Sequence, residues 1–221
     1  MAGSTLAAVV VLLASCTPDR SVSPPARAAV GQPNRQVNSP FNDAGVCMVD
    51  DVARFGSGPT NCTANDISIA QANVSQVNGN DVIPNTPIQC TPGTNISITM
   101  TATLKSTANS NRDDIGVWIA TDGGDAKTGA CRHYNLVVGS PGTINGTGGE
   151  TVDACAGMAE AAQTTLDLDT FSIPCNPIPD PNNPGQLAIK VGSCLSWKVP
   201  GQDELCPRGF TGNPATIYTA D

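Results

Sequence analysis

Histidine and basic residues are scarce in this sequence, and each of these shortages argues against a class of function. His133 is the one histidine in 221 residues, so a zinc site of two cysteines and two histidines is not encoded, and a hydrolase would have one imidazole to use as its base. Nucleic acid binding needs clustered Lys and Arg, whereas here 11 basic residues face 19 acidic ones and the net charge is −8. No G-x-S-x-G elbow, P-loop or dinucleotide fingerprint occurs. We therefore expect no enzymatic activity, no nucleic acid partner, and His133 as an exposed strand residue.

The apolar run Leu6 to Ser15 is too short to cross a bilayer as a helix, and its length is typical of a signal peptide. We expect residues 1–16 to be this peptide. Its end, Leu13-Ala14-Ser15-Cys16, resembles the lipobox of bacterial lipoproteins, in which the cysteine is lipidated. No Lys or Arg precedes the run, so cleavage by an ordinary peptidase near Cys16 stays open as the alternative. Either route leads outside the cytoplasm, with a lipid on Cys16 as the only expected membrane attachment.

Residues 17–40 are rich in Ser, Pro, Arg and Ala without apolar periodicity, which predicts a disordered linker. Residues 41–221 are expected to form a single domain, since the chain is 39% hydrophobic and only 14% charged. Glutamate, a helix former, supplies only 3 of the 19 acidic residues, while Gly 22 and Pro 18 favour short strands joined by turns. All-β is therefore the expected class.

The stretch from Asp113 to Cys131 combines the strongest strand with an acidic turn and a cysteine. Ile115, Val117 and Ile119 alternate with residues that are also apolar or small, which predicts a central strand buried on both faces. The turn Asp122-Gly123-Gly124-Asp125 supplies glycines for positive-φ positions and carboxylates that can accept backbone hydrogen bonds.

Other segments predict further strands and one helix. Asn95 to Leu104 has a strict period of two, with Ile96, Ile98, Met100, Ala102 and Leu104 on one face, and is expected to form a hairpin with the central strand through a loop of about eight residues. In Asp66 to Val74, Ile67, Ile69 and Gln71 alternate with small residues. In Leu166 to Ile173, apolar and polar residues alternate, and the alternation shifts by one residue near Thr170, as a bulge would allow. Single strands are also expected within residues 132–138, 186–199 and 215–219, and a short surface helix over residues 151–164. Together these elements predict a disulfide-bonded β-sandwich, immunoglobulin-like or jelly-roll-like, of about seven or eight strands with one short helix.

Apart from Cys16, eight cysteines remain, an even set that in an exported protein predicts up to four disulfides. No pair is spaced as C-x-x-C, so thiolate metal chemistry has no template here. The sequence does not select the connectivity; pairing of Cys62 with Cys90 and of Cys175 with Cys194 would each close a loop between predicted strands. The eight are Cys47, Cys62, Cys90, Cys131, Cys155, Cys175, Cys194 and Cys206.

Calcium is the one cofactor that the residues suggest. Asp122, Asp125, Asp167 and Asp169 offer carboxylate oxygens at turn or strand-edge positions, and turn carbonyls could complete a coordination shell. The alternative is that the first two cap the turn and the last two keep a solvent face polar. For sugar binding, Trp197 is the candidate aromatic residue, because the other tryptophan, Trp118, lies in the predicted buried strand.

Three segments together resemble an uncharacterised domain of exported bacterial surface proteins that carry DUF11-type or other immunoglobulin-like modules. They are Asn61-Cys62-Thr63-Ala64-Asn65-Asp66-Ile67, the segment from Asp114 through Ala120-Thr121-Asp122-Gly123-Gly124 to Thr128-Gly129-Ala130-Cys131, and Ile173-Pro174-Cys175. The resemblance implies a β-rich, disulfide-bearing surface module and carries over no catalytic residue.

These observations favour a non-enzymatic structural or adhesive domain outside the cell, including a fibre subunit that donates an extended segment to the sheet edge of another copy. Its expected partners are other copies of itself, or proteins or glycans of the cell surface. The alternative from a different class is a calcium-dependent carbohydrate-binding module.

Overall fold

The structure, a computed structural model of the chain, describes residues 8–11, 41–44, 47–48, 66–83, 88–136, 139, 141–144, 156–180, 184–199 and 218–220. The named elements of these residues are fourteen strands: β1 (Ala8–Val11), β2 (Phe41–Ala44), β3 (Ile67–Val77), β4 (Asn80–Asp81), β5 (Asn95–Ser106), β6 (Asp113–Ala120), β7 (Cys131–Asn135), β8 (Thr143–Ile144), β9 (Gly157–Met158), β10 (Gln163–Pro174), β11 (Pro177–Pro179), β12 (Leu187–Lys190), β13 (Ser193–Lys198) and β14 (Tyr218–Ala220). The expected all-β class is confirmed.

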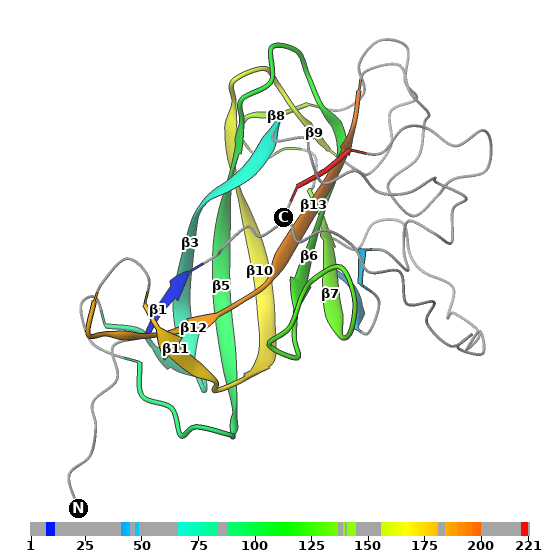
Figure 1. The fold of residues 1–221 in the computed structure, drawn as a ribbon. Coiled ribbons are helices and arrows are strands. Elements are labelled where there is room, and N and C mark those ends of the chain that lie inside the picture. Colours follow the sequence, from blue (N-terminus) through cyan, green and yellow to red (C-terminus); the bar gives the residue numbers. More distant parts are fainter. Residues whose placement is uncertain are drawn as a thin grey trace, which may run out of the picture.

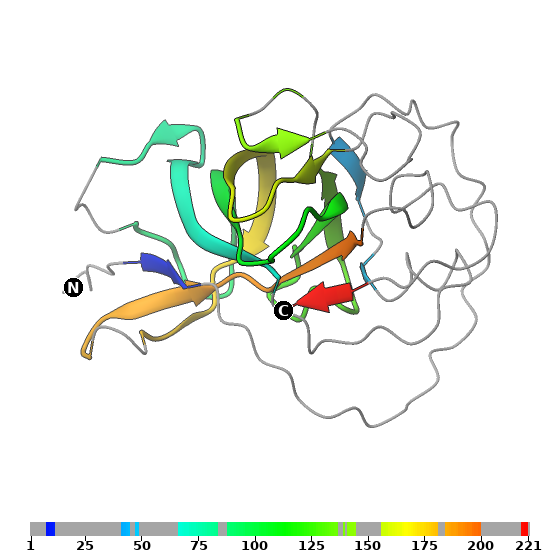
Figure 2. The same ribbon diagram turned by 90° about the horizontal axis from the view of Figure 1, so that it is seen from above.

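Two antiparallel sheets face each other and make the sandwich (Figures 1 and 2). The four-stranded sheet has the order β10-β5-β3-β4, and the five-stranded sheet has the order β14-β13-β6-β7-β2. A small sheet, β1-β12-β11, lies at the end near the N-terminus and contains a parallel pair between β1 and β12. A short pair, β8 and β9, lies near the opposite end.

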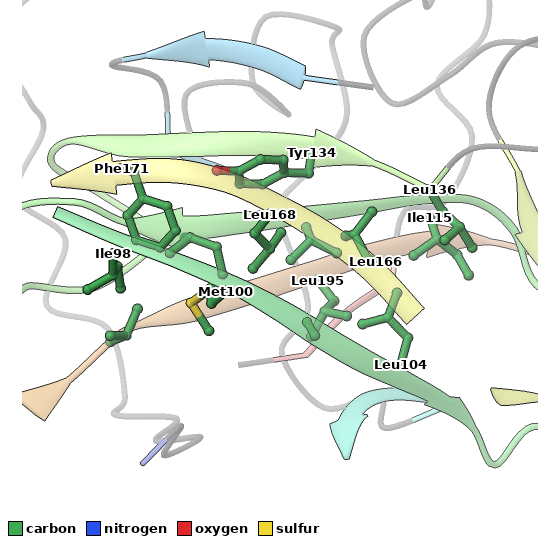
Figure 3. Close-up of a cluster of buried hydrophobic side chains, with 14 of the residues drawn as sticks. Ile98, Met100, Leu104, Ile115, Tyr134, Leu136, Leu166, Leu168, Phe171 and Leu195 are labelled. Atoms are coloured by element: carbon green, nitrogen blue, oxygen red, sulfur yellow. The ribbon is translucent and has the colours of Figure 1, made fainter. Parts of the chain in front are cut away.

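The main core fills the space between the two sheets (Figure 3). In β5 the five residues with a period of two are all buried, as predicted, because every second side chain of a strand points to the same face. All eight residues of β6 are buried, and β6 lies between β13 and β7, so the predicted central strand is confirmed. Burial of such side chains stabilises the fold by about 1.5–3 kcal/mol each.

Two long strands of the four-stranded sheet, β10 and β3, contain bulges. In β10 the register with β5 shifts between Leu168 and Phe171, which confirms the predicted phase slip near Thr170. In β3 the register shifts twice, between Ile69 and Gln71 and between Val74 and Gln76. The first shift inserts an extra residue and reverses the alternation. Ala72 and Val74 therefore pack against the core while Gln71 is exposed, contrary to the simple alternation predicted.

Three predictions about connections are wrong. β5 and β6 lie in different sheets, so they form no hairpin, and residues 107–112 cross from one sheet to the other. The predicted strand over residues 186–199 is two strands, β12 and β13, which also belong to different sheets. The predicted helix over residues 151–164 is contradicted by its described part, where β9 is followed by a turn and the start of β10. Among the described residues there is no helix long and apolar enough to cross a membrane.

The outer face of the five-stranded sheet is buried as well. Because residues alternate along β6, Ile115, Val117 and Ile119 belong to the main core, whereas Trp118 and Ala120 belong to a second cluster. The described members that complete the second cluster are Cys47, Met48, Ala126, Cys131 and Cys194. The sheet is therefore covered on both sides, which is why its central strand reads as a nearly continuous apolar run.

Several predicted features lie outside the described residues: the linker before β2, Cys16, Cys62, Cys155 and Cys206. Of the predicted signal peptide, Ala8–Val11 is described, as the strand β1 that pairs with β12 in parallel.

Candidate functional site

The acidic turn after β6 is held closed by its own carboxylates. Asp122 accepts hydrogen bonds from the backbone N–H of Gly124 at 2.9 Å and of Ala130 at 3.0 Å, and Asp125 accepts one from Lys127 at 2.9 Å. Gly123 has φ 78°, so the predicted positive-φ glycine is confirmed there, whereas Gly124 does not have a positive φ. Gly129, outside the predicted turn, has φ 103°. The two carboxylates act as turn caps in this structure, which is the structural alternative to calcium coordination.

The other pair of candidate calcium ligands lies on β10. Asp167 stands opposite Thr101 of β5 in a regular part of the ladder and is exposed. Asp169, at the bulge, accepts hydrogen bonds from Arg132 at 2.5 Å and from Tyr134 Oη at 2.7 Å. It therefore links the edge of one sheet to a strand of the other.

The environment of Asp169 changes the acid–base behaviour of both partners. Burial raises the pKa of Tyr134 well above its usual range, and the hydrogen bond and negative charge of Asp169 raise it further. Burial works to lower the pKa of Arg132, but the hydrogen bonds to Asp169 and Tyr134 outweigh it and the net pKa is raised. Tyr134 thus remains a neutral donor to the carboxylate, and this contact is structural.

The structure does not bring the four aspartates together. Among the described residues, no group of three or more Asp, Glu, His or Cys side chains is arranged to hold a metal ion. Asp122 and Asp125 belong to one loop, and Asp169 is engaged by a cation and a phenol. Calcium binding by this set stays a prediction that titration would have to test.

Trp197 is not available as a sugar-binding ring. Its side chain is 0% exposed and belongs to the main core, so the prediction of an exposed tryptophan is wrong. Trp197 keeps the period of two set by Ile189 and Val191, which lie in the same core, so the alternation itself places Trp197 on the inner face. Trp118 is also 0% exposed, as the buried-strand prediction required.

His133 is fully buried on the outer face of the five-stranded sheet, contrary to the exposed position predicted. Its ring stacks on Trp118, with centroids 4.3 Å apart and planes 11° from parallel. Gly116 lies between Asn135 and Ser196 in the ladders, and a Cβ there would come within 3.0 Å of His133 Nε2 and 3.1 Å of Ser196 Oγ. Position 116 therefore requires glycine to admit these side chains.

The hydroxyl of Ser196 and the imidazole of His133 both lie next to the position that a Cβ of residue 116 would occupy. A hydroxyl near an imidazole is one part of a nucleophile and base arrangement. Ser196 is 1% exposed and His133 is 0% exposed. A substrate cannot reach either atom in this structure, so the arrangement gives no support to an enzymatic function.

A buried ion pair joins β13 to β6. Lys198 Nζ lies 2.5 Å from Asp114 Oδ2, and the two side chains are 1% and 5% exposed. Asp114 also has φ 50°, in the left-handed region that non-glycine residues rarely adopt. Removing both charges of a buried ion pair from water costs free energy, so this pair is a local source of instability in the fold.

Two disulfides are described, and both differ from the suggested pairs. Cys47 bonds to Cys131 and Cys90 bonds to Cys175, with sequence separations of 84 and 85 residues. Pairing of Cys62 with Cys90 and of Cys175 with Cys194 is therefore wrong, because the suggested loops were local whereas the sandwich brings distant segments together. Cys194 is buried in the second cluster beside Cys131 and Cys47.

A shallow surface pocket of about 240 Å³ lies at the end of the β3–β4 hairpin. Ile83, on its rim, is 66% exposed, the larger value of the two exposed large apolar side chains among the described residues. The pocket is smaller than the roughly 300–1,000 Å³ typical of small-molecule sites. Its lining mixes apolar and amide side chains: Val77, Asn78, Asn80, Asp81, Val82, Ile83, Ile88 and Gln89.

Comparisons of this chain with protein-family profiles, with curated proteins and with solved structures find no match.

The sequence analysis did not predict that Asp114, Ser196 and Lys198 would be buried. One signal was present: Lys198 follows Trp197 at the end of a strand-like run, and the chain contains only four lysines at positions 105, 127, 190 and 198. The sequence predicts that β6 is buried on both faces but does not show which strand pairs with it, and a lysine whose partner is not known is expected to be solvated.

Proposed function

We propose that this chain is a non-enzymatic structural or adhesive domain that works outside the cell. The observation that carries the proposal is the pair of long-range disulfides. Each one closes a loop of more than 80 residues, which would stabilise the fold by about 2–4 kcal/mol, and such bonds persist in oxidising compartments. The apolar run at residues 6–15 and the resemblance to exported surface modules support the same setting.

The way charged residues are used also supports a structural role. Arg112 pairs with Asp66 at 2.8 Å, Arg132 with Asp169, and Lys198 with Asp114. These pairs join strands or the segments that connect the sheets. A catalytic site would instead gather such groups around a space open to a substrate.

The location can be tested in the cells that express the full chain. We expect the protein in the exported fraction, with its cysteines resistant to alkylation until a reductant is added. A protein found in the cytosol with thiols that react at once would contradict the proposal. Metabolic labelling with a fatty acid, compared between the native chain and Cys16→Ser, would separate a lipid anchor from free secretion.

For the adhesive part we propose association with other copies of the chain through the edge of β3. Among the described residues, β3 pairs with β5 along one side, whereas β4 covers only Gln76 and Val77 on the other. The regular stretch between the two bulges, Gln71 to Val74, is long enough to add a short strand. The bulges limit that length, since they interrupt the ladder of hydrogen bonds.

Electron microscopy and sedimentation across a range of concentrations would test self-association. Asn73→Lys places a charge on the exposed edge of β3 and should shift the assembly toward monomer, because lysine on an edge strand opposes pairing. Gln163→Lys, at an exposed position on the opposite edge strand, is the matched control and should leave the assembly unchanged. Dispersed monomers of the native chain at every concentration would overturn this part of the proposal.

A further inference from the structure

The buried pair of Lys198 and Asp114 brings an amine and a carboxyl group into reacting distance. Lys198 Nζ and Asp114 Oδ2 are 2.5 Å apart, and their side chains are 1% and 5% exposed. They come from β13 and β6, adjacent antiparallel strands in the middle of the five-stranded sheet, so the surrounding ladder fixes their relative position. Groups held in this way react with effective concentrations that reach about 10⁵–10⁸ M.

Amide formation needs the two groups in their uncharged forms. Because Lys198 Nζ and Asp114 Oδ2 are in direct contact, transfer of one proton between them gives a neutral amine and a neutral acid. A neutral lysine amine in an apolar site is a nucleophile, and a protonated carboxyl is the form that an amine can attack. The pair therefore contains the reactants for an amide bond without any further component.

We propose that Lys198 and Asp114 condense to an intramolecular amide that links β13 to β6 covalently. One proton passes from the ammonium to the carboxylate, and Lys198 Nζ then attacks Asp114 Cγ to form the C–N bond. The C–O bond to the carboxyl hydroxyl breaks, and that oxygen leaves with two protons from the former ammonium as one molecule of water. Ammonium and carboxylate thus become a secondary amide and water, with no change in net charge and no oxidation or reduction.

Two features of the fold favour this outcome over a permanent ion pair. An amide carries no charge, so condensation removes the cost of keeping two ions in the interior. Asp114 also has φ 50° within a strand, and strained non-glycine backbone of this kind is found where function requires a side chain in a particular place. The link would exist whatever the domain binds, so the inference does not depend on the proposed function.

Peptide mapping of the full chain tests the amide directly. After reduction, alkylation and trypsin digestion, an unlinked chain gives separate peptides 113–127 and 191–198. Trypsin does not cut after an acylated lysine, so the linked chain should give residues 113–127 joined to residues 191–208, at a combined mass lower by one water. Recovery of the two separate peptides with unmodified masses would overturn the proposal and show that the pair is ionic only.

Fragmentation of the joined peptide locates the bond. A link through Asp113, which stands opposite Lys198 in the ladder, would overturn the assignment of Asp114 as the acceptor. Loss of water confined to peptide 113–127 would show a succinimide at Asp122-Gly123 and would also count against the link, because that change joins no second peptide.

Three variants add independent readouts. Lys198→Arg should abolish the joined peptide, whereas Lys105→Arg, at an exposed position of β5, should leave it unchanged. Asp114→Asn should still react, with loss of ammonia in place of water, so its joined peptide should match that of the native chain in mass. Failure of a variant to fold does not affect the measurement on the native chain, which decides the proposal by itself.

Discussion

The two faces of the five-stranded sheet are equally buried but differ in chemistry. The described residues of the inner face, against the four-stranded sheet, are mainly apolar, and Tyr134 and Arg132 reach Asp169 across the sandwich. The outer face carries His133 stacked on Trp118, Ser196 and the pair of Lys198 and Asp114. The inner face is held by general apolar packing, whereas the outer face depends on a few specific contacts. Substitutions should therefore cost most where a single polar partner is removed from the interior.

The largest effect is expected from Asp114→Ala on the outer face. The change removes the group that Lys198, 1% exposed, meets on β6, in the ion pair and in the proposed amide alike, and deleting one member of a buried pair costs about 3–5 kcal/mol. The free energy of unfolding, measured with urea, gives the value. Asp167→Ala, at an exposed position of β10, is the control and should stay within about 0.5 kcal/mol of the native chain. A small effect at Asp114 would mean that the two faces do not differ in this way.

On the inner face, Leu104→Ala should cost about 2–5 kcal/mol, through lost apolar burial and the cavity that remains. Thr103→Ala, on the opposite side of the same strand, should cost much less, because that residue is only half-buried. Equal losses in the two variants, measured as shifts in denaturant midpoint, would show that β5 does not face the core with one side only.

The disulfides can be compared in the same way. Replacing Cys90 and Cys175 together by Ser should lower stability by about 2–4 kcal/mol, since their bond closes a long loop in the unfolded chain. The same double change at Cys47 and Cys131 should cost at least as much, because these residues also pack in the second cluster. Thermal unfolding of both variants, with and without reductant, shows which of the two loses more stability. A larger loss at Cys90 and Cys175 would contradict it.

The smallest effect, and the most specific one, concerns Tyr134. Its folded pKa is raised by burial and by Asp169, so the neutral phenol is favoured in the fold. This contribution is fully present below the unfolded pKa of about 10 and is lost as the pH rises through the folded value. Tyr134→Phe should cost about 1 kcal/mol at neutral pH and should weaken the decline of stability above pH of about 10. If the free energy of unfolding falls with rising pH in the same way in the native chain and in the variant, the contact between Tyr134 and Asp169 is not the cause of the decline.

Much of the fold could be predicted because strand signals are local. The period of two in β5, the continuous apolar run of β6 and the phase slip in β10 each follow from side-chain order along one strand. Which strands pair could not be predicted. β5 and β6 follow each other in the chain yet lie in different sheets, and the same is true of β12 and β13.

The sequence by itself determined the class of the protein: strands, cysteines suited to an oxidising environment, and a loop in which Asp122 and glycines close a turn. Only the tertiary structure decided which cysteines bond, that His133 is buried, and that Lys198 meets Asp114. The physical reason is distance along the chain. A turn or a strand is fixed by neighbours a few residues apart, whereas Lys198 and Asp114 are separated by 84 residues and meet only when β13 pairs with β6.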